Sequence, residues 1–71
     1  MLHIKNVNAR EQAMELIDDI WDNADYIALI AKASICTGEV RRDIKDAMAA
    51  QASIIITKLD KLGTIIDKYA E

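Results

Sequence analysis

Three aspartates in the first half of the chain have a spacing that can bind a metal ion. Asp18, Asp19 and Asp22 follow the pattern D-D-x-x-D, which on a helix places carboxylates along one face. Carboxylate oxygens suit Mg²⁺, and such a site can hold a diphosphate. The chain has no second acidic motif and no basic clamp, and a short motif carries little weight without its structural context. We therefore expect a solvated acidic face, with no metal and no cofactor.

The single cysteine and the single histidine do not form a catalytic pair. Cys36 has no second cysteine with which to form a disulfide or a zinc cluster. A nucleophilic cysteine needs a base within reach, and the only imidazole, His3, is expected outside the helices and far from Cys36. The chain is therefore predicted not to be an enzyme. A lone cysteine also fits a reducing, cytoplasmic location.

Acidic residues are concentrated between residues 11 and 25, a segment without Lys or Arg. Five of them recur at helical steps of three and four and so share one line: Glu11, Glu15, Asp18, Asp22 and Asp25. One interpretation is a solubilising surface. The other is a docking surface for a basic protein partner, for which charge complementarity sets orientation and speeds encounter.

A small basic cluster follows in the middle of the chain. Its members are Arg41, Arg42 and Lys45. Such a cluster can bind phosphates, and a nucleic-acid-binding regulator is the alternative function. Acids interleave with these bases and the formal net charge is −3, so nucleic acid is not the favoured partner.

One short turn organises the chain into two helices. Gly38 can adopt the positive φ that ends a helix, and Thr37 can cap the next one. With no proline and only two glycines, we predict an all-α, two-helix antiparallel hairpin with helices at about 9–36 and 39–69. Residues 1–71 form one domain, in which residues 1–8 are an N-terminal arm. Asn8 and Glu11 are expected to form a capping box at the first helix.

Apolar residues recur along both predicted helices. In the first helix, the expected seam toward the second consists of Ala13, Ile17, Ile20, Ala24, Ile27 and Ala31, with a second apolar line beside it at Met14, Trp21, Ala28 and Ile35. The second helix has one stripe: Val40, Ile44, Met48, Ile55, Leu59, Leu62, Ile66 and Tyr69. Gln51 interrupts this stripe. It is either a register-setting contact across a symmetry axis or the edge of the core.

A hairpin of this size has only one seam and needs a partner to complete its core. Between residues 26 and 36 the only charge is Lys32, and a helix that is apolar all round meets another element. We predict a homodimer that forms an antiparallel four-helix bundle. Its expected interface residues are Tyr26, Leu29, Ile30, Gln51, Ile55 and Ile56.

These features favour a small non-enzymatic regulatory or adaptor protein that acts through protein–protein contacts. An inhibitor or accessory factor encoded by a bacterium or a phage is the kind of protein expected. The longest uncharged run, residues 47–57, has eleven residues, whereas a membrane span needs about 20. Residues 1–10 lack the apolar core of a secretory signal. A cytoplasmic protein without membrane contact is therefore expected.

Overall fold

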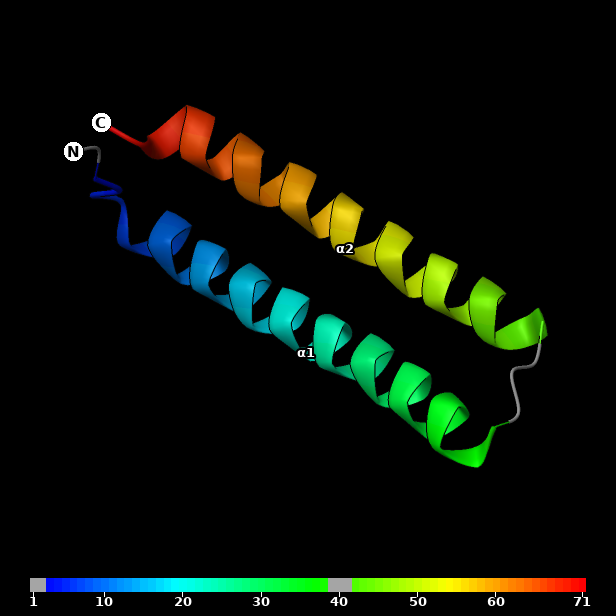
Figure 1. Cartoon of the computed structure of the whole chain (residues 1–71). Coiled ribbons are helices and arrows are strands. Elements are labelled where there is room, and N and C mark those ends of the chain that lie inside the picture. Colours follow the sequence, from blue (N-terminus) through cyan, green and yellow to red (C-terminus); the bar gives the residue numbers. More distant parts are fainter. Residues whose placement is uncertain (1–2, 39–41) are drawn as a thin grey trace.

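The computed structural model describes residues 3–38 and 42–71 and consists of two long helices folded back on each other. Helix α1 spans Val7–Thr37 and helix α2 spans Arg42–Tyr69, with 31 and 28 residues respectively. The helices lie side by side and antiparallel (Figure 1), in a molecule of 49 × 20 × 16 Å. The predicted all-α hairpin is confirmed. Neither helix, as described, has the length and apolarity needed to cross a bilayer.

Helix α1 begins two residues earlier than the sequence analysis predicts. Asn6 has extended dihedral angles (φ −68°, ψ 117°), and its Oδ1 accepts a hydrogen bond of 3.0 Å from the Ala9 N–H. This is the bond made by an N-cap residue. Asn8 lies inside the first turn of α1, so the predicted capping box of Asn8 and Glu11 is wrong.

The cap assignment predicts different effects for the two asparagines. Asn6→Ala should lower the free energy of unfolding by about 1 kcal/mol, because the Ala9 N–H loses its acceptor. Asn8→Ala is the matched control. It replaces an exposed residue inside the helix with a better helix former, so stability should stay equal or rise. Urea titrations of both variants measure the difference, and equal losses would contradict the assignment.

The residues before α1 pair with the C-terminal end of the chain. Ile4 and Ala70 form an isolated antiparallel bridge. The backbone N–H groups of His3 and Glu71 each donate to the other residue's carbonyl oxygen at 2.8 Å, and the Lys5 ammonium lies 3.6 Å from the Glu71 carboxylate. The predicted arm at residues 1–8 is therefore shorter, and its described part is anchored at the end of the hairpin opposite Gly38. We call this the open end, and the Gly38 end the turn end.

Gly38 ends α1 as predicted. It has φ 70° and ψ 4°, the left-handed conformation that favours glycine, and its N–H donates to the Ile35 carbonyl at 3.2 Å. Thr37, expected to cap the next helix, is instead the last residue of α1. Its hydroxyl lies 3.2 and 3.1 Å from two carbonyl oxygens in the preceding turn of α1. Residues 39–41, where the second helix was predicted to begin, lie outside the described residues.

Both helices are continuous where the sequence permits a break. Helix α1 runs through Asn23 and α2 runs through Gly63. Thr64, a possible cap for a separate last turn, instead donates its hydroxyl hydrogen to the Asp60 carbonyl at 3.0 Å, one turn earlier in the same helix.

The contact between the helices follows a strict heptad pattern. The half-buried or buried residues that alternate at steps of four and three define the seam. In α1 they are Ala9, Ala13, Leu16, Ile20, Asn23, Ile27, Ile30 and Ser34. In α2 they are Ile44, Met48, Gln51, Ile55, Lys58, Leu62, Ile65 and Tyr69. A repeat of 3.5 residues is typical of helices that pack at a small crossing angle, as in coiled coils.

This seam differs from the predicted one in its phase. In α1, the predicted seam residue Ala24 is exposed, while Leu16, Asn23 and Ile30 face α2. In α2, Leu59 and Ile66 are 48% and 43% exposed, and their preceding neighbours in the sequence lie in the seam. Five predicted residues, namely Ile17, Ala24, Ala31, Leu59 and Ile66, thus lie one position beyond the seam, on a second apolar stripe. The other described members of the prediction lie in the seam: Ala13, Ile20 and Ile27 in α1, and Ile44, Met48, Ile55, Leu62 and Tyr69 in α2.

Candidate protein-interaction surfaces

A polar layer crosses the middle of the seam. The Asn23 side-chain amide donates to Gln51 Oε1 at 2.8 Å, and the Lys58 ammonium donates to Asn23 Oδ1 at 2.5 Å. The Lys58 stem can lie along the seam while its charge reaches the amide. Gln51 therefore makes a contact within one chain, across α1 and α2. This contact matches neither interpretation left open for Gln51, since it lies in the seam of one chain and crosses no symmetry axis.

Little of the hairpin is fully covered by its own chain. Within the described residues, the buried hydrophobic side chains are Ala9 and Ala13, and no large side chain is fully buried. Ser34 is the buried polar residue, and its hydroxyl donates to the Ile30 carbonyl at 2.8 Å. The core therefore consists of a single layer of mostly half-buried residues, which is small even for a short chain.

One broad side of the hairpin is apolar on both helices. If the seam residues are assigned to heptad positions a and d, the residues of this side occupy the neighbouring positions e and b. In α1 the apolar residues at these positions are Val7, Met14, Ile17, Trp21, Ala24, Ala28, Ala31 and Ile35, and in α2 Ala49, Ala52, Ile56, Leu59, Gly63 and Ile66, with Ala70 following α2 in the same phase. Two exposed basic residues, Arg10 near the open end and Lys45 near the turn end, also occupy position e. In an antiparallel pair the e positions of both helices lie on the same side of the seam. We call this surface the apolar face.

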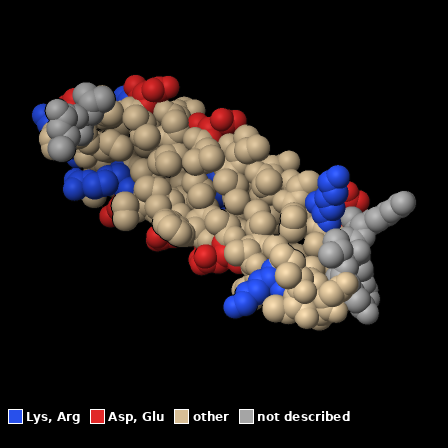
Figure 2. Space-filling model, in the orientation of Figure 1, with Lys and Arg blue, Asp and Glu red and all other residues tan. Residues whose placement is uncertain are grey.

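The apolar face is turned to the viewer in Figure 2, where uncharged side chains run the length of the molecule and acidic side chains line its long edges. Several large side chains on it are open to solvent: Val7, Met14, Trp21, Ile35 and Ile56 are 58%, 54%, 65%, 75% and 59% exposed. Monomeric soluble proteins rarely leave so large a contiguous apolar patch uncovered.

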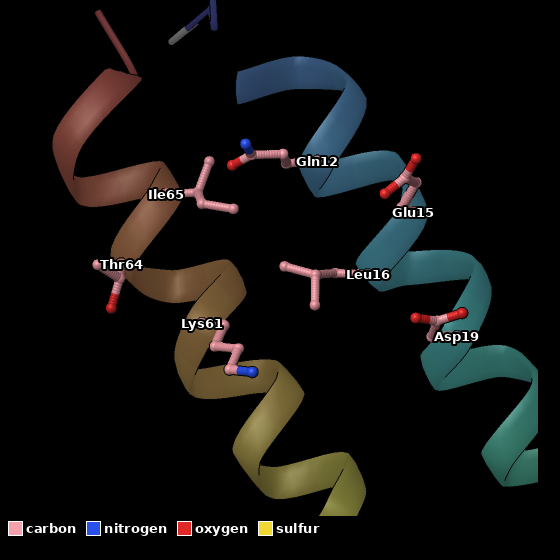
Figure 3. Close-up of a pocket in the computed structure, with 7 residues that line it drawn as sticks. All are labelled: Gln12, Glu15, Leu16, Asp19, Lys61, Thr64 and Ile65. Carbon is pink, nitrogen blue, oxygen red and sulfur yellow. The ribbon is translucent and has the colours of Figure 1, made fainter. Parts of the chain in front are cut away.

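The opposite side of the seam is polar near the open end. A groove of about 460 Å³ lies there between the helices. Figure 3 shows that Leu16 and Ile65 point toward each other across it, with Glu15 and Asp19 on the α1 wall and Lys61 on the α2 wall. The groove residues sit at heptad positions d, g and c, which places them across the seam from the apolar face.

The predicted acidic line is on the surface. Glu11, Glu15, Asp18, Asp22 and Asp25 are all exposed, and Glu15 also lines the groove. Among the described residues, no three His, Cys, Asp or Glu side chains gather to hold a metal ion. Docking of a partner on this line stays a prediction.

The six predicted dimer residues are divided among three places. Ile30, Gln51 and Ile55 lie in the seam of a single chain. Tyr26 and Leu29 are exposed and follow the groove residues Asp19 and Glu15 by one and two heptads, so they lie on the groove side. Ile56 lies on the apolar face. Three members of this set lie in the seam between the helices of one chain, and the dimer interface itself stays a prediction.

The predicted basic cluster is only partly described. Lys45 is exposed on α2. Arg41 and the side chain of Arg42 lie outside the described residues, so this structure adds nothing to the nucleic-acid alternative. His3 and Cys36 lie at opposite ends of the hairpin, since His3 pairs with the C-terminal end and exposed Cys36 is two residues before Gly38.

Comparisons of this chain with protein-family models, with curated proteins and with solved structures found no match.

The apolar face is the surface that the sequence analysis recognised only in part. The line Met14, Trp21, Ala28 and Ile35 was recognised, but its counterpart on α2 was not. The missed signal is the seven-residue spacing of Ala49, Ile56, Gly63 and Ala70, which matches the spacing of the α1 line. Since heptad positions on both helices can be written from the sequence, this second line was available once the seam was placed correctly.

Proposed function

We propose that this chain is a non-enzymatic protein–protein interaction module, a small regulator or adaptor, and that its hairpin is one half of a homodimeric four-helix bundle. The observation that carries the proposal is the apolar face, which is exposed along both helices. A surface of this kind normally contacts another protein.

The accessible surface supports the same proposal. A compact monomer of 7.9 kDa exposes about 4,400 Å². This chain exposes 5693 Å², an excess of about 1,300 Å² over that value. A partner that covers one side of the hairpin removes an excess of this size from water and gives the helices the second layer that a single seam lacks.

The acidic line supplies a second surface for the regulatory partner. Its five carboxylates are exposed and contribute little to the fold, because like charges three or four residues apart repel each other by a few tenths of a kcal/mol. Solubility needs only mixed charge, as on α2. We propose that this line docks a basic protein, with charge complementarity setting the orientation of the encounter.

Affinity capture from extracts of the source organism tests this function. Wild-type chain should retain a stoichiometric protein partner, and Asp18→Lys with Asp22→Lys should retain at least about tenfold less at low salt. Asp60→Lys with Asp67→Lys is the matched control, because it makes the same charge change at exposed positions of α2. The thermal midpoints of all three should be similar.

Equal capture by both double variants would remove the acidic line from the proposal. If the wild-type chain retained no stoichiometric partner at any salt concentration, the regulatory function itself would be contradicted.

A further inference from the structure

We infer that the apolar face is covered by a second copy of this chain, turned about a two-fold axis perpendicular to the helices that passes near Trp21 and Ile56. The two Gly38 turns then lie at opposite ends of a four-helix bundle. This inference rests on the proposed function and adds the orientation and the register of the second copy.

The size of the face fits a second copy. The hairpin measures 49 by 20 Å, so one broad side is on the order of 1,000 Å². A standard protein–protein interface buries about 800 Å² on each partner. A copy with the same length and width covers the whole face, and no part of the apolar stripe on either helix is then left against water.

Gly63 is a separate indication that something packs on this face. It lies inside α2, where a glycine costs about 1 kcal/mol relative to alanine. Its φ is not positive, and a Cβ placed there meets no atom of the described chain within 4 Å. Neither the backbone nor the chain's own packing requires a glycine at this position. A neighbouring chain that approaches α2 closely provides a reason.

Side-chain size on the face is unevenly distributed between its two ends. The large residues of its inner part lie toward the open end: Met14, Ile17, Leu59 and Ile66. The small ones lie toward the turn end: Ala24, Ala28, Ala31, Ala49 and Ala52. Trp21 and Ile56 lie between the two groups. Ile35 near the turn end and Gly63 and Ala70 near the open end depart from this division. Apart from these three, the face is raised toward the open end and low toward the turn end.

A two-fold axis perpendicular to the helices lays the raised half of one copy on the low half of the other. Met14 then meets the partner's Ala28, and Ile17 meets the partner's Ala24. On α2, Leu59 meets the partner's Ala52 and Gly63 meets the partner's Ala49. Trp21 and Ile56 each meet their own counterparts. Three of these pairs, Met14 with Ala28, Ile17 with Ala24 and Leu59 with Ala52, put a large side chain on a small one, which is how close-packed layers interdigitate.

An axis parallel to the helices gives a different result. It places both turns at the same end and stacks the raised half on the raised half. The alanine-rich halves then face each other across a gap. Gaps of this kind cost stability in proportion to their volume, so the perpendicular axis is the one that the face favours.

Cys36 allows the orientation to be measured in the wild-type chain. It is the only cysteine and is exposed. A spin label on it should give a distance of about 45 Å between the two copies by pulsed electron paramagnetic resonance, because residue 36 lies fifteen residues from the axis at 1.5 Å each. A distance under about 30 Å would overturn the perpendicular axis, since both labels would then be at one end of the bundle.

An exchange of two residues tests the register. Ala28→Met places a large side chain against the partner's Met14 and should weaken dimerisation at least about 30-fold. Adding Met14→Ala restores one large and one small residue at each contact and should recover most of the loss. Failure of the second change to rescue the first would overturn the register.

The occupant is tested by the same samples. If the spin-labelled wild-type sample gave no dipolar signal and had the mass of a monomer, the face would not be covered by a second copy. Capture of a regulatory partner by that monomer would still support the regulatory role in the proposed function, although not its homodimer, so the two failures are distinguishable.

Discussion

Ile55→Asp should unfold the chain. Ile55 is half-buried in the seam between α1 and α2. Burying an unpaired charge costs several kcal/mol, and a single core of this size supplies only about 3–5 kcal/mol in total. The loss is therefore comparable with the whole stability. Ile20→Asp, at the equivalent seam position of α1, should have the same effect.

Ile54→Asp is the matched control, because it makes the same change one residue earlier. Ile54 is 41% exposed and lies on the groove side, away from both the seam and the apolar face. Its helical circular-dichroism signal and thermal midpoint should stay close to wild type. If Ile55→Asp retained both signals as well, the seam as described would be wrong.

Trp21→Glu should separate the dimer into monomers. Trp21 is 65% exposed in a single hairpin, and in the proposed bundle it lies near the two-fold axis, so each substitution acts twice. An aromatic side chain buries 150–250 Å² at about 25 cal/mol per Å². Loss of both tryptophans at the interface should raise the dissociation constant at least about a thousandfold.

Tyr26→Glu distinguishes a dimer interface on the apolar face from the interface predicted from the sequence, which included Tyr26. Tyr26 is also a large exposed aromatic residue of α1, at 52%, but it lies on the groove side. The same change there should leave dimerisation nearly unaffected. The wild-type thermal midpoint should rise with protein concentration, as expected for a dimer, and Tyr26→Glu should keep that dependence. A monomeric Tyr26→Glu with a dimeric Trp21→Glu would place the interface on the groove side.

The hairpin and its turn could be predicted because their signals are local. Gly38 is the one residue near the middle of the chain that favours the left-handed conformation, and helical periodicity continues on both sides of it. The start of α1 could not be predicted in the same way. Asn6 and Asn8 are both suitable caps, and the choice involves a contact that is distant in sequence, the pairing of Ile4 with Ala70.

The phase of the seam was ambiguous for a physical reason. Each helix carries two apolar stripes that run side by side, and steps of three and four fit either of them. A sequence argument favours the stripe with fewer polar residues. In this structure the stripes between the helices also contain Asn23 and Lys58, which join Gln51, already part of the predicted stripe, in mutual hydrogen bonds. That mutual satisfaction depends on residues far apart in the sequence.

The same ambiguity explains why the candidate interface changed. Ile30, Gln51 and Ile55 lie half-buried in the seam of a single chain. The proposed interface is therefore centred on the apolar stripe that contains Trp21 and Ile56. The uneven distribution of large and small residues between its two ends becomes relevant when a second copy is laid over it, which a single-helix pattern does not reveal.

Sedimentation equilibrium of the wild-type chain tests the central claim most directly, namely that the apolar face is covered by a second copy. At micromolar concentration the account predicts a mass twice the 7.9 kDa of one chain, and a mass of one chain for Trp21→Glu under the same conditions. A wild-type mass of 7.9 kDa at every concentration up to about 100 μM, with a native helical spectrum, would contradict it.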